Sequence, residues 1–389
     1  MGGRTGPTVD PAGDILGADV GRVCGRRGGS ARIRQARRGA GRLRDDTERR
    51  GTRMVLRADA RLRVAVVGTG LIGGSVLLRL HAVGVDVTGW DPDEQTRRQA
   101  RLAGVPTAER LVDAVAGRDV VFLGGPLPTL PATLVEVAAA TAEDCLLTDV
   151  GSTKAELAAF AAEQGLTSRF IPGHPMAGTD RAGLAAALPD LFTGAAWVLC
   201  PAPDGLAAFR RLVTLVTDVF AARVVPMAAD RHDAVVALAS HVPHLLAGAL
   251  AGAAHRSPSR DAVLALAAGS FRDGTRVAGT PAHRTGNMLR GNRDQVLAAL
   301  TQVTGFLDEL AAALRCDDVD ALTARYAEAA AARAELAGRP YDEQVMSFPV
   351  GAAAAEVAWL YDVGAAGGHL SGCRAGADTV SYVARRPRV

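Results

Sequence analysis

The chain has 389 residues, and at roughly 100–200 residues per domain this length indicates two domains, or three. Hydrophobic residues make up 48% and charged residues 22%, as in a soluble protein with a sizeable buried core. The net charge of +3 is too small, and the aromatic share of 4% too low, to favour a nucleic-acid-binding surface.

Membrane insertion and secretion are not indicated either. No uninterrupted apolar run approaches the roughly 20 residues of a membrane span, and the N-terminus lacks a signal-peptide core. The cysteines are odd in number, lie far apart and form no CxxC motif; they are Cys24, Cys145, Cys200, Cys316 and Cys373. A disulfide framework or a metal site is therefore not expected, and these features favour a cytoplasmic protein.

Residues 1–60 mix glycine, arginine and aspartate without helical or strand periodicity. Such a segment buries too little apolar surface to offset its chain entropy, so we expect a disordered extension. Met54 precedes the first periodic pattern and is the expected natural start, which leaves 53 residues as an extension of little functional weight. A basic arm that binds nucleic acid is the alternative, but acidic residues are interspersed in it.

From Arg61 onward, short apolar runs alternate with helical patterns. The runs expected to be buried strands are 63–68, 85–91, 119–126 and 145–152, with further strands over 169–178 and 195–201. The helices between them are expected over 71–84, ending at Gly84; over 92–104, opening with Pro92; and over 130–141. Strands that alternate with helices predict a doubly wound parallel sheet, in a domain over residues 61–226.

Strand patterns end near residue 227, and residues 227–338 are rich in alanine and leucine at helical spacing. Helices that are apolar nearly all round must be buried, so we expect an all-α domain that packs in a bundle or against a second subunit. Residues 342–386 read as a short strand–helix–strand segment.

A dinucleotide-binding motif follows the first expected strand. Gly68, Gly70 and Gly73 form a GxGxxG pattern that closes a strand and opens a helix, whose first residues are Leu71 and Ile72. Gly68 permits a tight turn, Gly70 lets the backbone approach a pyrophosphate, and Gly73 lets the helix pack closely on the sheet. A turn without a ligand is the alternative interpretation.

The acidic residue Asp91 ends the second expected strand, where a carboxylate binds the ribose hydroxyls and repels a 2′-phosphate. We therefore predict NAD as the cofactor, although Arg97 and Arg98 lie close enough in sequence to accept NADP. Gly125 and Pro126, in the turn after the third strand, are also expected to contact the cofactor.

Two polar segments follow later strands, at the sheet edge where ligands bind in such folds. In DVGSTK, Ser152 and Lys154 are expected to point toward the nicotinamide end of the crevice, and Lys154 is the only lysine among 44 basic residues. In GHPMAG, His174 lies between glycine and proline on a constrained loop. An imidazole titrates near neutrality, which suits proton transfer, although a lone histidine is more often structural.

The helical region carries two further polar segments. His241 and His244, three residues apart in SHVPH, face one side of a helix and are expected to line a pocket, unless they are hydrogen-bonded core residues. Arg276, in FRDGTR, is suited to clamp a substrate carboxylate, unless it or Arg272 pairs with Asp273.

Taken in order, GTGLIGGS, Asp91, DVGSTK, GHPMAG, SHVPH and SFRDGTRVAG resemble the prephenate dehydrogenase family, which includes the arogenate and cyclohexadienyl dehydrogenases of tyrosine synthesis. The resemblance covers roughly residues 62–315. It implies a Rossmann domain followed by a helical dimerisation domain, as in 6-phosphogluconate dehydrogenase, and hence a homodimer. It also implies that residues 342–386 are a shortened ACT-like segment.

The activity implied by the resemblance is NAD-dependent oxidative decarboxylation of prephenate to 4-hydroxyphenylpyruvate, or of arogenate to tyrosine. His174 would draw the proton from the ring hydroxyl and Ser152 would orient the hydroxyl or His174. Arg276 would hold a substrate carboxylate, with His241, His244 and Lys154 also at the substrate.

The family often carries a tryptophan and an aspartate after TRVA, where this chain has Thr285 and Asn287. This departure leaves the choice between a keto and an amino side chain open. A β-hydroxyacid dehydrogenase is less favoured, because no lysine follows residue 154. A non-catalytic NAD-sensing regulator is the other alternative.

Overall fold

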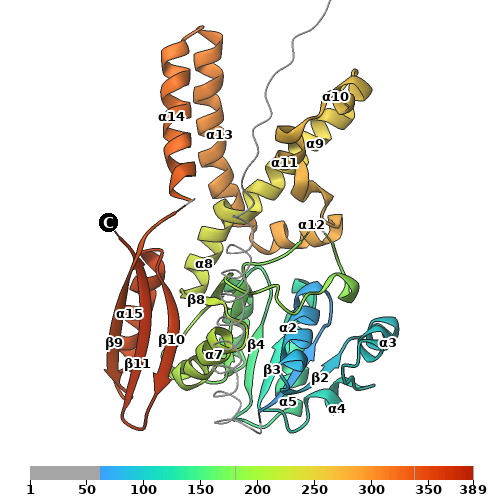
Figure 1. Cartoon of the computed structure of the whole chain (residues 1–389), viewed down its shortest axis with the longest axis vertical. Coiled ribbons are helices and arrows are strands. Elements are labelled where there is room, and N and C mark those ends of the chain that lie inside the picture. The colour runs from blue at the N-terminus through green and yellow to red at the C-terminus, as the bar shows by residue number, and fades with distance from the viewer. Residues whose placement is uncertain (1–61, 180, 337, 389) are drawn as a thin grey trace, which may run out of the picture. The chain divides into compact units, whose positions relative to one another are not determined.

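The computed structural model describes residues 62–179, 181–336 and 338–388. The expectations for residues 1–60, including Met54 and Cys24, lie outside the described residues. The first of two sheets is parallel, with strand order β2-β1-β3-β4-β5 (Figure 1). Its strands are β1 (Arg63–Val67), β2 (Asp86–Trp90), β3 (Val120–Leu123), β4 (Leu146–Asp149) and β5 (Phe170–Ile171). The expected doubly wound parallel sheet is confirmed.

Helices cover both faces of this sheet because successive strand residues point to opposite sides. Val64 and Val66 share one buried cluster with α2 and α7, whereas Ala65 and Val67 share another with α4, α5 and α6. These helices are α2 (Leu71–Ala82), α4 (Leu111–Val115), α5 (Leu130–Ala140), α6 (Ala155–Glu163) and α7 (Leu206–Asp218). The remaining helix of this region, α3 (Glu94–Leu102), follows β2.

The helix boundaries follow local chemistry. Gly84 has φ +81° just beyond α2, in the left-handed region that glycine adopts without steric cost. Asp93, and not Pro92, caps α3, since its carboxylate accepts hydrogen bonds from the backbone N–H groups of Gln95 and Thr96. The expected opening of this helix at Pro92 is therefore wrong by two residues.

The second sheet is mixed and has strand order β6-β7-β8-β10-β11-β9. Its strands are β6 (Gly173–Pro175), β7 (Ala196–Leu199), β8 (Arg223–Pro226), β9 (Tyr341–Pro349), β10 (His369–Ala375) and β11 (Thr379–Pro387), with α15 (Ala353–Ala365) after β9. Segments 169–178 and 195–201 thus do not extend the parallel sheet as a whole: β5 belongs to it, but β6 and β7 do not. Sequence reasoning also missed β8, β10 and α7.

Sheet pairing and buried hydrogen bonds join the C-terminal strands to the rest of the protein. Leu370 on β10 pairs with Val224 on β8, so the C-terminal segment extends the second sheet. In the core, Glu356 of α15 accepts hydrogen bonds from Arg210 of α7 and from the Tyr382 hydroxyl. The segment is therefore β–α–β–β and docked, not the strand–helix–strand unit expected; its likeness to an ACT domain stays a prediction.

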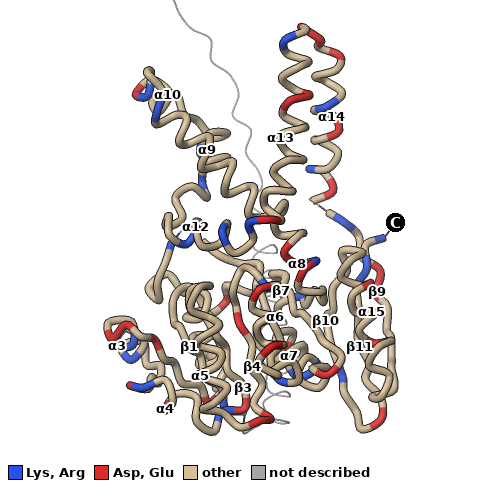
Figure 2. The backbone as a smooth tube through the Cα atoms, turned by 180° about the vertical axis from the view of Figure 1, so that it is seen from behind, with Lys and Arg blue, Asp and Glu red and all other residues tan. Residues whose placement is uncertain are grey.

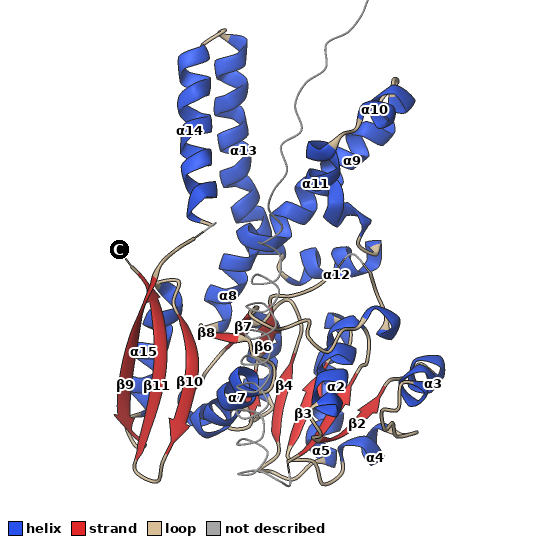
Figure 3. Ribbon diagram, in the orientation of Figure 1, coloured by secondary structure: helices blue, strands red, loops and turns tan. Residues whose placement is uncertain are grey.

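Residues 229–335 are helical, as expected. The elements are α8 (Ala229–Val236), a π-helical turn (Ala237–His241), α9 (Val242–Arg256), α10 (Arg260–Leu266), α11 (Gly269–Thr275), a 3₁₀ turn (Arg276–Gly279), α12 (Ala282–Gly291), α13 (Arg293–Arg315) and α14 (Val319–Glu335) (Figure 3). A small core of Ala237, Val242, Val296 and Ala299 joins α9 to α13.

Two helical stretches are long and apolar enough, by length and composition, to cross a membrane: Ala229–Arg256 and Arg293–Arg315. Neither stretch is an uninterrupted apolar run, because polar residues such as Ser240, His241 and Thr301 interrupt them. Only 28% and 17% of their most apolar windows are buried in the single chain, and Figure 2 shows long uncharged stretches along α9 and α13. Leu250, Leu297 and Leu307 are among the exposed side chains. An exposed apolar helix face of this kind marks a surface that another protein or a membrane covers.

Candidate active site

The glycine-rich turn between β1 and α2 has the geometry of a nucleotide site. Gly68 has φ +86°, and a Cβ there would lie 2.6 Å from the backbone nitrogen of Gly125. A Cβ on Gly73 would lie 2.0 Å from the carbonyl oxygen of Gly68. A Cβ on Gly70, in contrast, would meet nothing within 4 Å, so the space beside Gly70 is open. The three positions match the three roles that the motif requires.

The N-terminus of α2 faces this open space without a side-chain cap. Gly70 is its N-cap residue and provides no side-chain hydrogen bond to the first turn. The N–H groups of Leu71 and Ile72 are then available for the oxygens of a pyrophosphate, which the helix dipole also favours. Leu71 itself is buried, so only its backbone can serve a ligand. These residues fit a dinucleotide.

Asp91 follows β2 directly, and its carboxylate is held by two backbone N–H groups. Oδ2 accepts from Thr69 at 2.8 Å and Oδ1 from Asp93 at 3.0 Å. A carboxylate has about four lone-pair sites, so capacity remains for ribose hydroxyls. Arg97 donates a hydrogen bond to the carbonyl oxygen of Asp91 and forms an ion pair with Glu109. Its guanidinium is therefore already bound by protein groups and is not free for a 2′-phosphate. The arrangement fits NAD.

The loop after β3 forms the other wall of the turn. A Cβ on Gly124 would lie 2.5 Å from the carbonyl oxygen of Gly68, and the N–H of Gly124 donates to Val67. Gly125 and Pro126 continue this loop into the 3₁₀ turn Leu127–Thr129. Gly125 therefore lies next to the glycine-rich turn, and contact of Gly125 and Pro126 with the cofactor stays a prediction.

Lys154 does not reach the crevice. Its side chain has no exposed surface, and its ammonium group forms an ion pair with the equally buried Asp149. The expectation that Lys154 binds substrate is therefore wrong. Asp149 also accepts backbone hydrogen bonds from Gly151 at 2.8 Å and from Gly173 at 3.1 Å. The pair thus ties the loop that carries Ser152 to the strand that carries His174.

His174 lies on β6 and belongs to a buried chain of polar groups. Its Nδ1 is 2.9 Å from Nε2 of His232 on α8, and Nδ1 of His232 is 2.7 Å from Oδ1 of Asp233. The Asp233 carboxylate also accepts from the backbone N–H groups of Lys154 and Ala155, at 2.8 and 2.9 Å. The helical region and the nucleotide-binding region therefore meet at His174.

The chain of polar groups continues toward α9 and α13. The side-chain amide of Asn292 donates to the carbonyl oxygen of Asp233 at 2.7 Å and lies 3.1 Å from Nδ1 of His241. Burial lowers the pKa of His241 to about 4, so this imidazole is neutral near pH 7. His241 has no exposed surface, so in this structure it supports the site from behind and does not line a pocket.

The environment of His174 suits a base. Burial lowers its pKa well below the usual 6.5, and the neighbouring His232, Lys154 and His241 lower it further. The imidazole is then unprotonated near pH 7 and available to take a proton. Because His174 retains 9% of its surface and His232 retains none, only His174 is accessible to a substrate.

The other predicted residues lie in varied settings. Ser152 is half-buried in the loop after β4. His244 is also half-buried, and its Nδ1 lies 2.9 Å from the carbonyl oxygen of Ser240. Arg276 is exposed in the single chain, and its role as a carboxylate clamp stays a prediction. Among the described residues, no ion pair joins Asp273 to Arg272 or Arg276.

Sequence reasoning missed His232, Asp233 and Asn292. The adjacent histidine and aspartate belong to the polar sequence DRHD, which precedes a long alanine- and valine-rich helical stretch, and this was the available signal. Within the part of the chain that the structure describes, no group of three histidine, cysteine or acidic residues is placed to hold a metal ion.

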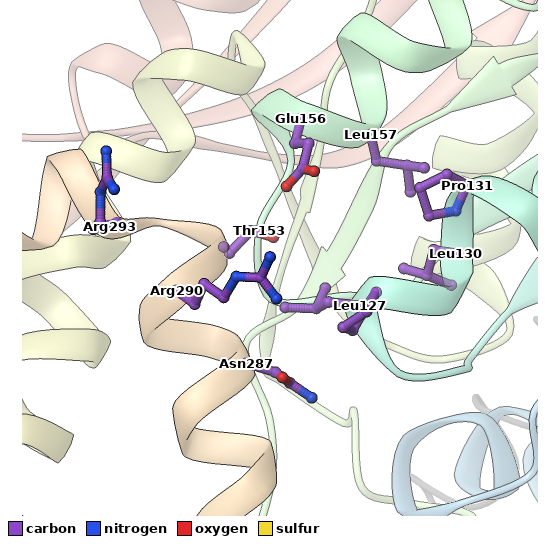
Figure 4. A pocket seen from close by; sticks show the side chains of 11 residues that line it. Leu127, Leu130, Pro131, Thr153, Glu156, Leu157, Asn287, Arg290 and Arg293 are labelled. Atoms are coloured by element: carbon purple, nitrogen blue, oxygen red, sulfur yellow. The ribbon is translucent and has the colours of Figure 1, made fainter.

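A pocket of about 440 Å³ lies beside this network, between α12 and the starts of α5 and α6. Figure 4 shows Asn287 and Arg290 on the α12 side, with Glu156 and Leu127 on the other. Thr153, between Ser152 and Lys154, also lines it. A Cβ on Gly178 would lie 3.7 Å from the Arg284 guanidinium, so α12 also approaches the loop that follows His174.

Comparison with known proteins points to one family. The model for the nucleotide-binding domain of prephenate dehydrogenase matches residues 75–225, and the model for its dimerization domain matches residues 228–328. A cyclohexadienyl dehydrogenase of Zymomonas mobilis is 30% identical over 70% of this chain and 95% of its own. A prephenate dehydrogenase of Bacillus subtilis is 31% identical over 67% and 72%, respectively.

Among solved structures, prephenate dehydrogenase from A. aeolicus in complex with hydroxyphenyl propionate and NAD+ has a TM-score of 0.65 and 26% identity, over 71% of this chain and 98% of that one. Sequence, fold and the geometry of the nucleotide site together place the chain in the prephenate dehydrogenase family of NAD-dependent oxidoreductases.

Proposed function

We propose that the chain catalyses NAD-dependent oxidative decarboxylation of prephenate to 4-hydroxyphenylpyruvate, with His174 as the general base. The observation that carries the proposal is the setting of His174: a neutral, nearly buried imidazole on the strand after the nucleotide-binding sheet, with Nδ1 already engaged by His232. The relatives named for prephenate and cyclohexadienyl substrates support the substrate class.

The roles of the residues follow from the chemistry of the substrate. The chemistry that bound NAD supplies is acceptance of a hydride from the ring carbon that carries the hydroxyl group. His174 accepts the hydroxyl proton through Nε2 as the C–O bond gains carbonyl character. The electron pair of the departing carboxylate then makes the ring aromatic, and the phenol oxygen takes a proton back from His174. Ser152 orients the hydroxyl group, and Arg276 holds a carboxylate.

The charge on α12 favours the keto substrate over the amino one. Over Ala282–Gly291 the helix carries Arg284 and Arg290 and no acidic residue, and Asn287 stands where the family often has an aspartate. Prephenate has two carboxylates and no ammonium, so it suits a cationic helix, whereas the ammonium of arogenate would be repelled. Arogenate dehydrogenase activity is the second candidate, favoured only because the family includes enzymes that act on arogenate.

A parallel assay tests this proposal. We would follow formation of NADH or NADPH with prephenate, arogenate and simple β-hydroxyacids, each with NAD and with NADP. We expect the highest kcat/KM with prephenate and NAD. Higher kcat/KM with arogenate would contradict the substrate assignment, and turnover of a β-hydroxyacid alone would contradict the reaction class.

We also propose a homodimer in the cytoplasm, formed through the helical region. The apolar faces of α9 and α13, described above, are exposed in the single chain, and the matching family model is that of a dimerization domain. Sedimentation equilibrium on the purified protein would test the dimer, and membrane fractionation of cells would test the location. A monomer at micromolar concentration, or protein in the membrane fraction, would contradict these proposals.

A further inference from the structure

The histidine and aspartate of α8 stand directly behind His174, in a part of the core closed to solvent. His232 has no exposed surface and Asp233 is 3% exposed. The two imidazole rings meet edge to face, with centroids 5.1 Å apart and an interplanar angle of 78°. Neither His232 nor Asp233 can touch a substrate, so any part in the reaction must act through His174.

Hydrogen-bond donors and acceptors fix where the protons lie in this chain. Both Asp233 oxygens accept backbone N–H groups, from Lys154 and Ala155, so the side chain is an acceptor-only carboxylate. Nδ1 of His232, 2.7 Å from Oδ1, must then carry the proton of that ring. In neutral imidazole the other nitrogen is an acceptor, so Nε2 of His232 accepts and Nδ1 of His174 donates.

The consequence for His174 is a single tautomer. With its proton on Nδ1, the lone pair is on Nε2, the nitrogen for which no hydrogen-bond partner exists among the described residues. The carboxylate at the far end is held by three donors and cannot turn away, because two of them belong to the first residues around the start of α6. The ring of His174 is therefore oriented from behind by two residues of a different region of the chain.

We propose that His232 and Asp233 are positioning residues that hold His174 as the Nδ1–H tautomer, with Nε2 directed to the substrate hydroxyl. This inference rests on the proposed role of His174 as general base. When His174 takes the proton, its Nδ1–H stays bonded to His232, and the positive charge is stabilised through His232 by the Asp233 carboxylate. No proton needs to leave His174 toward α8.

If position 232 served packing alone, any side chain of similar volume would be tolerated there. A leucine at position 232 would fill similar space, but Nδ1–H of His174 would then be buried without an acceptor. Such a group costs free energy, so His174 would turn or change its tautomer. A glutamine at the same position can still accept through its side-chain oxygen. The two substitutions therefore separate the hydrogen bond from the volume.

The kinetic test compares His232→Leu with His232→Gln in the full-length protein, using prephenate and NAD. We expect His232→Leu to lower kcat by about 10- to 100-fold, a part of the worth of general-base catalysis, with little change in the KM of NAD. His232→Gln should restore most of that loss. His369→Gln, at a buried histidine of β10 that lies against Tyr341, serves as the matched control and should leave kcat unchanged. Equal kcat in His232→Leu and the parent would overturn the proposal.

A second measurement reads the tautomer in the parent protein and needs no turnover. Nitrogen chemical shifts of ¹⁵N-histidine-labelled protein report the tautomer of each of the eight histidines, with His174 assigned from its loss in His174→Asn. We expect His174 and His232 both as Nδ1–H tautomers at neutral pH. An Nε2–H tautomer at His174 would overturn the proposal even if prephenate is turned over. The Nδ1–H tautomer without turnover of prephenate would instead count against the proposed function.

Discussion

The ammonium group of Lys154 and the carboxylate of Asp149 form an ion pair in which neither side chain keeps any exposed surface. Asp149 is the last residue of β4 and Lys154 is the N-cap residue that precedes α6, so the pair closes the loop that contains Ser152. The same carboxylate accepts a hydrogen bond from the backbone N–H of Gly173, the residue before His174. One buried ion pair thus fixes the spacing between the loop that carries Ser152 and the strand that carries His174.

Replacing Lys154 by methionine should destabilise the protein strongly. The substitution leaves Asp149 buried without its counter-charge, and breaking a buried pair in this way costs about 3–5 kcal/mol. Urea denaturation would measure the change in the free energy of unfolding. Arg98→Ala removes an exposed pair with Glu94 and should cost less than about 1 kcal/mol. A Lys154→Met protein as stable as the parent would contradict the structural role assigned here.

His174→Asn should reduce turnover without loss of the cofactor. General-base catalysis is worth about 10²–10⁴ in rate, so kcat should fall by that factor. The dissociation constant of NAD, measured by calorimetry, should stay close to that of the parent, because the glycine-rich turn is unaffected. Near-normal turnover in this variant would remove His174 from its proposed role.

The sequence predicted the parallel sheet and the nucleotide site because both depend on local patterns. The run from Val64 through Gly73 contains the strand, the turn and the helix start in consecutive residues. The second sheet was not predicted, since β8 is only four residues long and its neighbour β10 joins it from far along the chain. Pairings between such distant segments depend on tertiary packing and leave no periodic signal.

Some active-site residues could likewise be predicted from local sequence, and others could not. His174 stood out because it lies between a glycine and a proline, although the structure places it on the strand β6 and not on the expected loop. Its partner His232 lies 58 residues away, and only the folded chain brings the two rings together. Lys154 was noticed because it is the only lysine, but its role was misjudged, since rarity in sequence says nothing about whether a side chain points into a crevice or into the core.

Gly70→Ala should separate cofactor binding from folding. The added methyl group meets no protein atom within 4 Å, and the φ of Gly70 is −69°, outside the left-handed region that favours glycine. It would occupy the space that a pyrophosphate needs, so we expect NAD to bind at least about tenfold more weakly, the equivalent of about 1.4 kcal/mol. The melting temperature without NAD should match that of the parent. Unchanged NAD affinity would contradict the placement of the pyrophosphate at this turn.

The companion substitution, Gly73→Ala, should behave differently. Its methyl group would lie 2.0 Å from the backbone oxygen of Gly68, so helix and turn must move apart. We therefore expect a lower melting temperature even without NAD, together with weaker NAD binding. A Gly73→Ala protein with the parent's melting temperature would show that the turn adapts more readily than its geometry indicates.

Arg276→Ala should mainly raise the KM of prephenate. An arginine that clamps a carboxylate in substrate and transition state alike contributes uniform binding, so its loss affects KM more than kcat. Arg272→Ala, one helical turn earlier in the same exposed segment, is the matched control and should leave both constants close to those of the parent. An unchanged KM in Arg276→Ala would mean that another cation, on α12 for instance, holds the carboxylate.

Stability should fall as the solution is acidified below about pH 6.5, the ordinary pKa of histidine. Burial lowers the pKa of His174 well below that value, and those of His241 and His369 to about 4. Below pH 6.5 the unfolded chain therefore binds protons that the folded chain does not, which favours unfolding. This stability is fully present above pH 6.5 and is lost progressively as the pH falls toward 4. Urea denaturation at pH 7 and at pH 5.5 would measure the loss. His369→Gln removes one of these histidines and should show a smaller loss, and an equal or larger one would contradict the lowered pKa of His369.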